Sequence, residues 1–146
     1  MNRIVSLVAV RFLIACSHPS NVDDSERSTK IDGTVPGIFT IQNGQAVRVR
    51  TSTGNVAIQV ASVIESRCPS DLICVWQGKV DVAFQFGDKE KRILLCLPEQ
   101  TLNCQQEAEI SYQNKEYKLK LIKVEPYPTT TDESEPKVVT FELRLK

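Results

Sequence analysis

The sequence predicts an all-β domain, either an antiparallel β-sandwich or a small β-barrel of about eight strands. Short segments in which apolar and polar residues alternate follow one another along the chain, and helical periodicity is hard to find. Turn residues separate several of these segments, at Asn43-Gly44, Ser52-Thr53-Gly54 and Gly87-Asp88. Of the two architectures, we favour the sandwich.

Eight strands are expected. In chain order they are Gly37 to Gln42, Ala46 to Thr51, Asn55 to Glu65, Cys74 to Phe86, Lys91 to Leu97, Glu107 to Tyr112, Glu116 to Val124 and Val139 to Lys146. The fourth has the clearest alternation, which places Cys74, Trp76 and the apolar residues from Val80 to Phe86 on one buried face. So long a strand usually bends or carries a bulge, and Gly78 is the natural place for it.

The last strands add two further expectations. Apolar parity changes after Leu121, which predicts a bulge or a strand that passes between two sheets. The final strand should turn Val139, Phe141, Leu143 and Leu145 inward. Residues 125–136, rich in Pro and Thr, should form a long exposed loop before it.

The N-terminal region differs from this pattern. Residues 17–34 are mostly polar, and such a segment buries too little apolar surface to offset the entropy of ordering. We therefore interpret residues 16–34 as a flexible tether and residues 35–146 as a single domain.

The stretch Leu13-Ile14-Ala15-Cys16 resembles a bacterial lipobox. The resemblance implies a signal peptide over residues 1–15, with Arg3 in its positively charged part, and a diacylglyceryl group on Cys16 of the mature chain. Arg11 is an unusual charge for the apolar part. The alternative is a buried strand or an uncleaved anchor helix, but a spanning helix needs about 20 mostly apolar residues and this run is shorter.

The predicted anchor indicates where in the cell the protein is located. Two or three acyl chains make membrane attachment stable. In bacteria resembling the enterobacterial case, a residue other than Asp after the lipidated cysteine directs the protein outward, and Ser17 follows Cys16. We expect a lipid-anchored protein of the cell envelope, at the outer rather than the inner membrane.

Four cysteines remain in the domain, which in an exported chain indicates two disulfides. Three pairings are possible. Because turn-like stretches separate the two close pairs, we favour Cys68 with Cys74 and Cys96 with Cys104. Zinc would need cysteines two to four residues apart, often with histidine partners, and neither spacing fits.

The densest local pattern runs from Ser66-Arg67-Cys68-Pro69 to Cys74-Val75-Trp76-Gln77-Gly78. It resembles the SRCPxxxxCVWxG signature of a family of small secreted and lipid-anchored bacterial β-proteins whose function is largely uncharacterised. Residues 117–128 are also similar to that family, and the resemblance covers roughly residues 35–146. It implies an all-β fold and no particular activity.

Two interpretations of this loop compete. The favoured one places Trp76 in the core beside the Cys68–Cys74 disulfide. In the other, Arg67, Ser70 and Asp71 project from the rigid loop and bind a partner, for which a braced loop is suited because it loses little entropy on binding.

Catalysis has little support in the sequence. The only histidine, His18, lies in the tether, and the domain cysteines are expected to be oxidised, so no nucleophile has an evident base. The candidates for a carboxylate pair are Asp71, Asp81, Glu107 and Glu109. Glu107 and Glu109 alternate with Ala108 and Ile110 as on a solvated strand face. The run Asp132 to Glu135 lacks the spacing of a calcium loop.

Charge excludes a further class. The chain has 18 basic and 18 acidic residues, and removal of residues 1–15 takes away only Arg3 and Arg11, which leaves a net charge of −2. A nucleic-acid-binding protein would need a basic patch. We expect a non-enzymatic binding module without metal or cofactor, attached to the membrane by lipid and able to bind an envelope protein. The alternative is a periplasmic lysozyme or protease inhibitor that acts through the Cys68–Cys74 loop.

Overall fold

The computed structural model of the chain describes residues 33–146 except residues 53, 88–90, 99–103 and 132–134. The described part folds into nine strands and contains no helix long and apolar enough to cross a membrane. The strands are β1 (Gly33–Thr34), β2 (Gly37–Gln42), β3 (Ala46–Thr51), β4 (Gly54–Glu65), β5 (Lys79–Phe86), β6 (Lys91–Pro98), β7 (Glu107–Tyr112), β8 (Lys115–Glu125) and β9 (Val138–Leu145).

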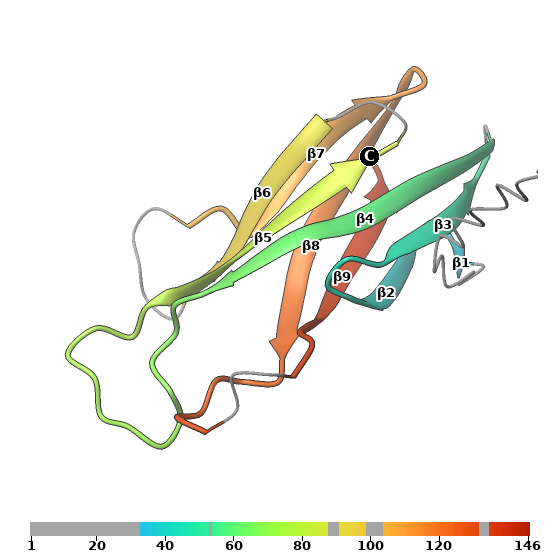
Figure 1. Cartoon of the computed structure of the whole chain (residues 1–146). Helices are drawn as coiled ribbons and strands as arrows, with labels where there is room; N and C mark the ends of the chain where they lie inside the picture. Colours follow the sequence, from blue (N-terminus) through green and yellow to red (C-terminus); the bar gives the residue numbers. More distant parts are fainter. Residues whose placement is uncertain (1–32, 53, 88–90, 99–103, 132–134) are drawn as a thin grey trace, which may run out of the picture.

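The strands form two sheets that pack face to face, so the predicted all-β sandwich is confirmed (Figure 1). One sheet has the order β1-β3-β4-β5-β6 and the other β2-β9-β8-β7. All pairings are antiparallel except that of the two-residue β1, which runs parallel to β3. Gly33 and Thr34, expected at the end of the tether, form this strand. The predicted signal peptide, Cys16 and the rest of the tether lie outside the described residues.

Seven of the eight predicted strands agree with the structure to within one or two residues at each end. The exception is the strand predicted from Cys74, because β5 begins only at Lys79. Gly78 has a φ of +71°, and its α-carbon lies so close to Ser66 that an added β-carbon would be 1.8 Å from the Ser66 carbonyl oxygen. Gly78 therefore ends the preceding loop and does not form a bulge inside a strand.

The change of parity in β8 comes from a bulge, one of the two predicted possibilities. The register with β9 shifts between Leu121 and Lys123, so Ile122 lies partly exposed while Leu121 and Val124 are both buried. A second shift lies in β4 between Val60 and Ser62. Each bulge adds a residue to one strand and bends it, which increases the local twist.

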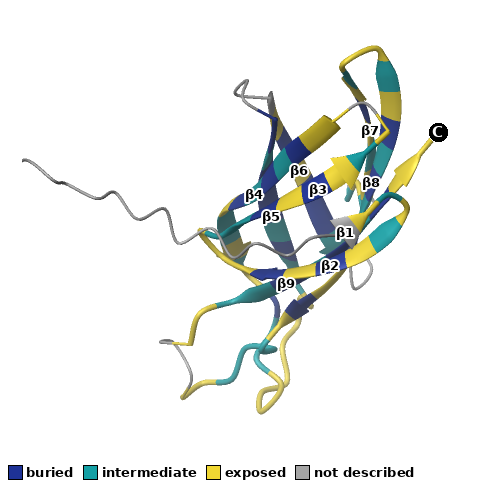
Figure 2. Ribbon diagram, turned by 90° about the vertical axis from the view of Figure 1, so that its right-hand side faces the viewer, coloured by how far each residue is buried: buried dark blue, intermediate teal, exposed yellow. Residues whose placement is uncertain are grey.

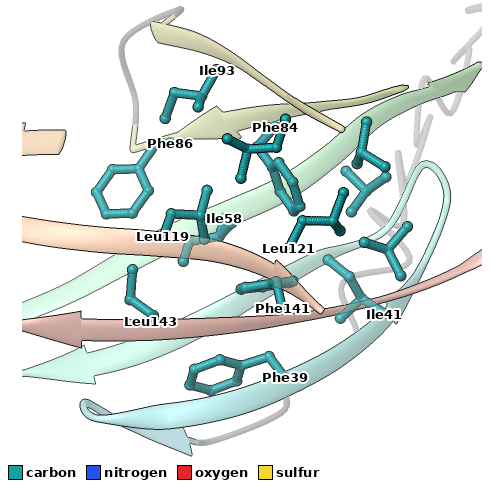
Figure 3. Packing of buried hydrophobic residues seen from close by; sticks show 14 of the residues in the cluster. Phe39, Ile41, Ile58, Phe84, Phe86, Ile93, Leu119, Leu121, Phe141 and Leu143 are labelled. Carbon is teal, nitrogen blue, oxygen red and sulfur yellow. The ribbon is translucent and has the colours of Figure 1, made fainter. Parts of the chain in front are cut away.

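The core fills the space between the sheets with aliphatic and aromatic side chains from both (Figure 3). Phe84 of β5 meets Phe141 of β9 edge to face, with ring centroids 5.2 Å apart, and Phe39 of β2 stacks on Phe141 at 5.6 Å. Full burial of each such side chain contributes roughly 1.5–3 kcal/mol. The alternation predicted for β9 holds through Leu143, whereas Leu145 is exposed at the end of the chain.

The two ends of the sandwich differ. β4 is 12 residues long, about 40 Å at roughly 3.3 Å per residue, and spans the molecule (Figure 1). The described chain begins beside Val49 at one end of β3. The loop of residues 66–78 leaves the opposite end of β4 and lies against the segment of residues 126–131.

Candidate functional site

The loop of residues 66–78 stands on a narrow base. Beyond the ends of β4 and β5, the Ser66 amide donates to the carbonyl oxygen of Lys79 at 2.9 Å, and the Cys68 amide donates to that of Gln77 at 2.8 Å. The Ser66 hydroxyl donates to the same Lys79 carbonyl at 2.6 Å. These bonds continue the β4–β5 pairing for two more steps, so the loop leaves the sheet as a closed finger.

A disulfide closes the finger. Cys68 and Cys74 are bonded, with their α-carbons 5.9 Å apart, and the second disulfide joins Cys96 with Cys104. Both predicted pairings are confirmed. Such covalent closure restricts the loop in the unfolded chain as well as in the folded one.

Arg67 fastens the base of the loop to the sandwich. Its guanidinium group binds the Glu65 carboxylate through two nitrogens, with Nε 2.7 Å from Oε1 and Nη2 2.5 Å from Oε2. Nη1 donates to the Val124 carbonyl oxygen at 3.2 Å, and the group lies 4.4 Å from the centre of the Tyr127 ring. Only 8% of Arg67 is exposed. The interpretation in which Arg67 projects from the loop to bind a partner is therefore wrong, and the residue holds the loop in place.

Glu65 stays ionised in this setting. Burial alone would raise the pKa of its carboxyl group, but the hydrogen bonds from Arg67 and the positive charges of Arg67 and Lys137 outweigh burial and lower the pKa below its ordinary value. The Lys137 ammonium lies 3.5 Å from the Glu65 carboxylate and donates to the Pro126 carbonyl oxygen at 2.7 Å. The Glu65 carboxylate thus binds two cations, Arg67 and Lys137, that are far apart in the sequence.

A second set of bonds holds the outer part of the loop. The Ser70 amide donates to the Pro128 carbonyl oxygen at 2.9 Å. The Asp71 carboxylate accepts hydrogen bonds from the Thr130 amide, at 3.1 and 3.2 Å, and from its hydroxyl. The bond from the Thr130 hydroxyl lowers the pKa of Asp71 below its ordinary value. Both Ser70 and Asp71 are exposed, and their role in binding a partner remains a prediction.

The end of the finger carries four exposed apolar side chains, three of which are the most exposed large apolar side chains of the described residues. Ile73 is 105% exposed, Val75 93%, Trp76 83% and Leu72 53%. We call these four residues the apolar tip. The favoured sequence interpretation of Trp76 is therefore wrong, since its indole lies in solvent and not in the core. Yellow ribbon marks the exposed loop at the lower end of the molecule in Figure 2.

Two open hollows lie on the surface. One, of about 400 Å³, lies between the finger and Tyr127 and is bordered by Cys68, Ser70, Ile73 and Gln77 among others. The other, of about 500 Å³, lies on the outer face of the larger sheet and is lined by Ala61, Ser62, Gln85 and Arg92. Neither contains the convergent acids that a hydrolase would need.

The predicted carboxylates are not gathered into one site. Asp81 lies on β5 and pairs with Lys79 at 2.9 Å. Glu107 and Glu109 lie on β7 in the other sheet, where they pair with Lys118 at 2.6 Å and Lys146 at 2.8 Å. Within the described ranges, no three His, Cys, Asp or Glu side chains come together in a way that could hold a metal ion.

Fold and site together define a disulfide-braced β-sandwich with one rigid, apolar finger. No known protein family, curated protein or solved structure matches the chain. The resemblance to the signature family therefore stays a prediction. The sequence did not predict the partners of the loop, which are Glu65, Val124, Tyr127, Pro128 and Thr130, nor the contact of Lys137 with Glu65. The only local signal was the Glu65-x-Arg67 spacing, which places both residues on one side of an extended chain.

Proposed function

We propose that this protein is a lipid-anchored, non-enzymatic binding module of the bacterial envelope and that the apolar tip is its contact surface. Four bulky apolar side chains in solvent have an unfavourable hydration free energy that a bound partner would relieve. They occupy a loop that a disulfide, the Arg67–Glu65 pair and the Asp71–Thr130 contacts hold rigid. A braced loop loses little entropy on binding.

The exposure of the tip carries the proposal. Ile73, Val75 and Trp76 would be less exposed if the finger folded back onto the surface of the sandwich, yet the two sets of bonds at its base and side hold it outward. The proposed location in the cell envelope rests on the lipobox resemblance at Cys16 and on the preference of disulfides for oxidising compartments. The signature resemblance supports membership of a family of secreted and lipid-anchored β-proteins.

Photo-crosslinking in the producing bacterium tests the contact surface. A photoreactive amino acid replaces Ile73 in the full-length chain, and the matched control replaces Ile38, which is 65% exposed on β2 of the other sheet. The adducts are identified by mass spectrometry, which also detects a lipid modification on Cys16. We expect adducts from position 73 that position 38 does not give. Equal labelling from both positions would refute the tip as the contact surface.

The alternative function is inhibition of a lysozyme or protease by insertion of the Cys68–Cys74 loop into the enzyme cleft. The observation in its favour is the protruding, covalently closed loop whose most exposed side chain, Ile73, lies between the two cysteines. Inhibition assays against a panel of lysozymes and serine proteases test it. Asp71→Ala, which removes the bonds to Thr130, should weaken any inhibition, whereas Glu109→Ala on β7 should not.

A further inference from the structure

We propose that the apolar tip inserts into the lipid bilayer and gives the protein a second, non-covalent membrane contact beside its predicted lipid anchor. This inference rests on the proposed function, because it names the partner class of the same contact surface. Its site is the stretch from Leu72 to Gly78, and the occupant is a bilayer with zwitterionic headgroups.

The chemistry of the stretch suits the membrane interface. No charged residue occurs from Leu72 to Gly78, so no ionised group has to leave water when the tip enters the headgroup region. Three of the side chains are aliphatic, and tryptophan favours the boundary between acyl chains and headgroups. The disulfide keeps the stretch folded, so insertion does not require it to become ordered first.

The size of the tip favours a bilayer over a protein. A standard protein interface buries about 800 Å² and roughly 20–30 residues on each side. The tip offers four apolar residues, and its surroundings at Asp71, Gln77 and Thr130 are polar and exposed. Insertion into a membrane requires no minimum contact area, because each apolar side chain that leaves water contributes its own favourable transfer free energy.

Charge selects the kind of bilayer. Cations in the segments that flank the tip are already paired: Lys79 with Asp81, Lys123 with Glu125, and Arg67 and Lys137 with Glu65. Attraction to anionic lipids needs unpaired lysine or arginine side chains near the surface. The described surroundings of the tip supply none, so a neutral, zwitterionic surface fits best.

The chain is long enough for the tip and Cys16 to reach the same membrane. A segment of 16 residues separates Cys16 from Gly33, and a fully extended chain covers about 3.3–3.6 Å per residue, or roughly 55 Å. β4, which separates the start of the described chain from the finger, spans about 40 Å. Attachment of Cys16 would keep the tip at a high local concentration near the bilayer, which makes even weak insertion effective.

Trp76 provides the test, because it is the only tryptophan of the chain. The full-length lipidated protein is reconstituted into phosphatidylcholine vesicles with plain or brominated acyl chains. We expect a blue-shifted Trp76 emission in both and a loss of emission with the brominated lipid. Replacing half of the lipid by phosphatidylglycerol should not strengthen either effect, and a requirement for this anionic lipid would overturn the proposed neutral contact.

Two matched variants complete the experiment. Ile73→Asp places a charge on the tip and should reduce the inserted fraction roughly tenfold or more. Ile38→Asp places the same charge on the other sheet and should leave the emission unchanged. Since Ile73 is fully exposed, its variant should keep the circular dichroism spectrum of the folded protein.

Failure of this inference can be told apart from failure of the proposed function. Trp76 emission that stays at its solvent-exposed wavelength and is insensitive to bromine would overturn insertion. If position 73 then crosslinks to a protein in cells, the tip is a contact surface for a protein and only the bilayer inference is lost. If position 73 gives no more adducts than position 38 either, both proposals fail.

Discussion

The guanidinium group of Arg67 and the carboxylate of Glu65 form a two-pronged ion pair at the foot of the exposed finger, with side chains only 6% and 19% exposed. The pair matters beyond its own contact, because Arg67 also reaches the Val124 carbonyl and the Tyr127 ring. It thereby joins the end of β4 to the end of β8, which lie in different sheets. The position of the finger depends on this joint.

Arg67→Ala should destabilise the domain by about 2–3 kcal/mol, because it removes the two-pronged partner of the largely buried Glu65 carboxylate and leaves only the more distant Lys137 ammonium, at 3.5 Å, to balance that charge. Urea denaturation measures the free energy of unfolding. The control is Arg144→Ala, whose ion pair with Glu142 lies on the surface and should contribute less than about 1 kcal/mol. Equal losses in the two variants would show that the buried pair does not fasten the loop.

Because of Glu65, the free energy of unfolding should decrease at acid pH. Its pKa is lower in the folded protein than its ordinary value of 4.5, so its contribution is complete above that value and disappears as the pH falls through the folded pKa. Unfolding free energies measured from neutral to acid pH should therefore decrease more steeply in the wild type than in Glu65→Gln. Parallel curves for the two proteins would contradict the assignment.

Replacement of Cys68 and Cys74 by serine should cost about 2 kcal/mol, since the disulfide closes a short loop. The sandwich should still fold, because the loop lies outside the core. The finger itself should loosen, and chymotrypsin should then cleave after Leu72 or Trp76 much faster than in the wild type. Replacement of Cys96 and Cys104 is the control and should leave cleavage at these two sites unchanged.

Trp76→Ala should change the free energy of unfolding by no more than about 0.5 kcal/mol, because the side chain is exposed. Phe84→Ala, which empties a position in the centre of the core, should cost about 3–5 kcal/mol. Thermal and urea denaturation of both variants test the contrast. A large loss in the Trp76 variant would restore the interpretation of this residue as part of the core.

The same alternation that predicts most of the fold misplaces Trp76. In β2, β3 and β7 one strand face is buried and the other is exposed to solvent, so the alternation of apolar and polar residues matches the burial of each residue. From Cys74 to Phe86 the alternation is just as regular, but it cannot show where the neighbouring strand stops. β4 ends at Glu65, and backbone hydrogen bonds continue its pairing with β5 only as far as Cys68 and Gln77, so the residues from Cys74 to Trp76 lie in the loop.

The position of Arg67 could not be predicted for a different reason. Its partner Glu65 is local, but the Val124 carbonyl that it binds is 57 residues away, and the Tyr127 ring is still farther along the chain. Pairing at such a distance follows from the way the two sheets pack around one core, which no local pattern specifies. A lone arginine before a cysteine therefore looks exposed in the sequence although it is buried in the fold.

The last prediction concerns Gly78, where the chain turns from the finger into β5. Gly78→Ala should destabilise the domain by at least about 2 kcal/mol, because a left-handed residue other than glycine costs roughly 1–2 kcal/mol and the new β-carbon would also collide with the Ser66 carbonyl oxygen. Gly44→Ala separates the two effects, since Gly44 has a φ of +84° but no atom within 4 Å of the added carbon. It should cost only the conformational part, about 1 kcal/mol. If the two variants unfold at the same urea concentration, Ser66 and Gly78 do not approach as closely as the structure shows, and the finger has a wider, more mobile base than the one that holds the apolar tip outward.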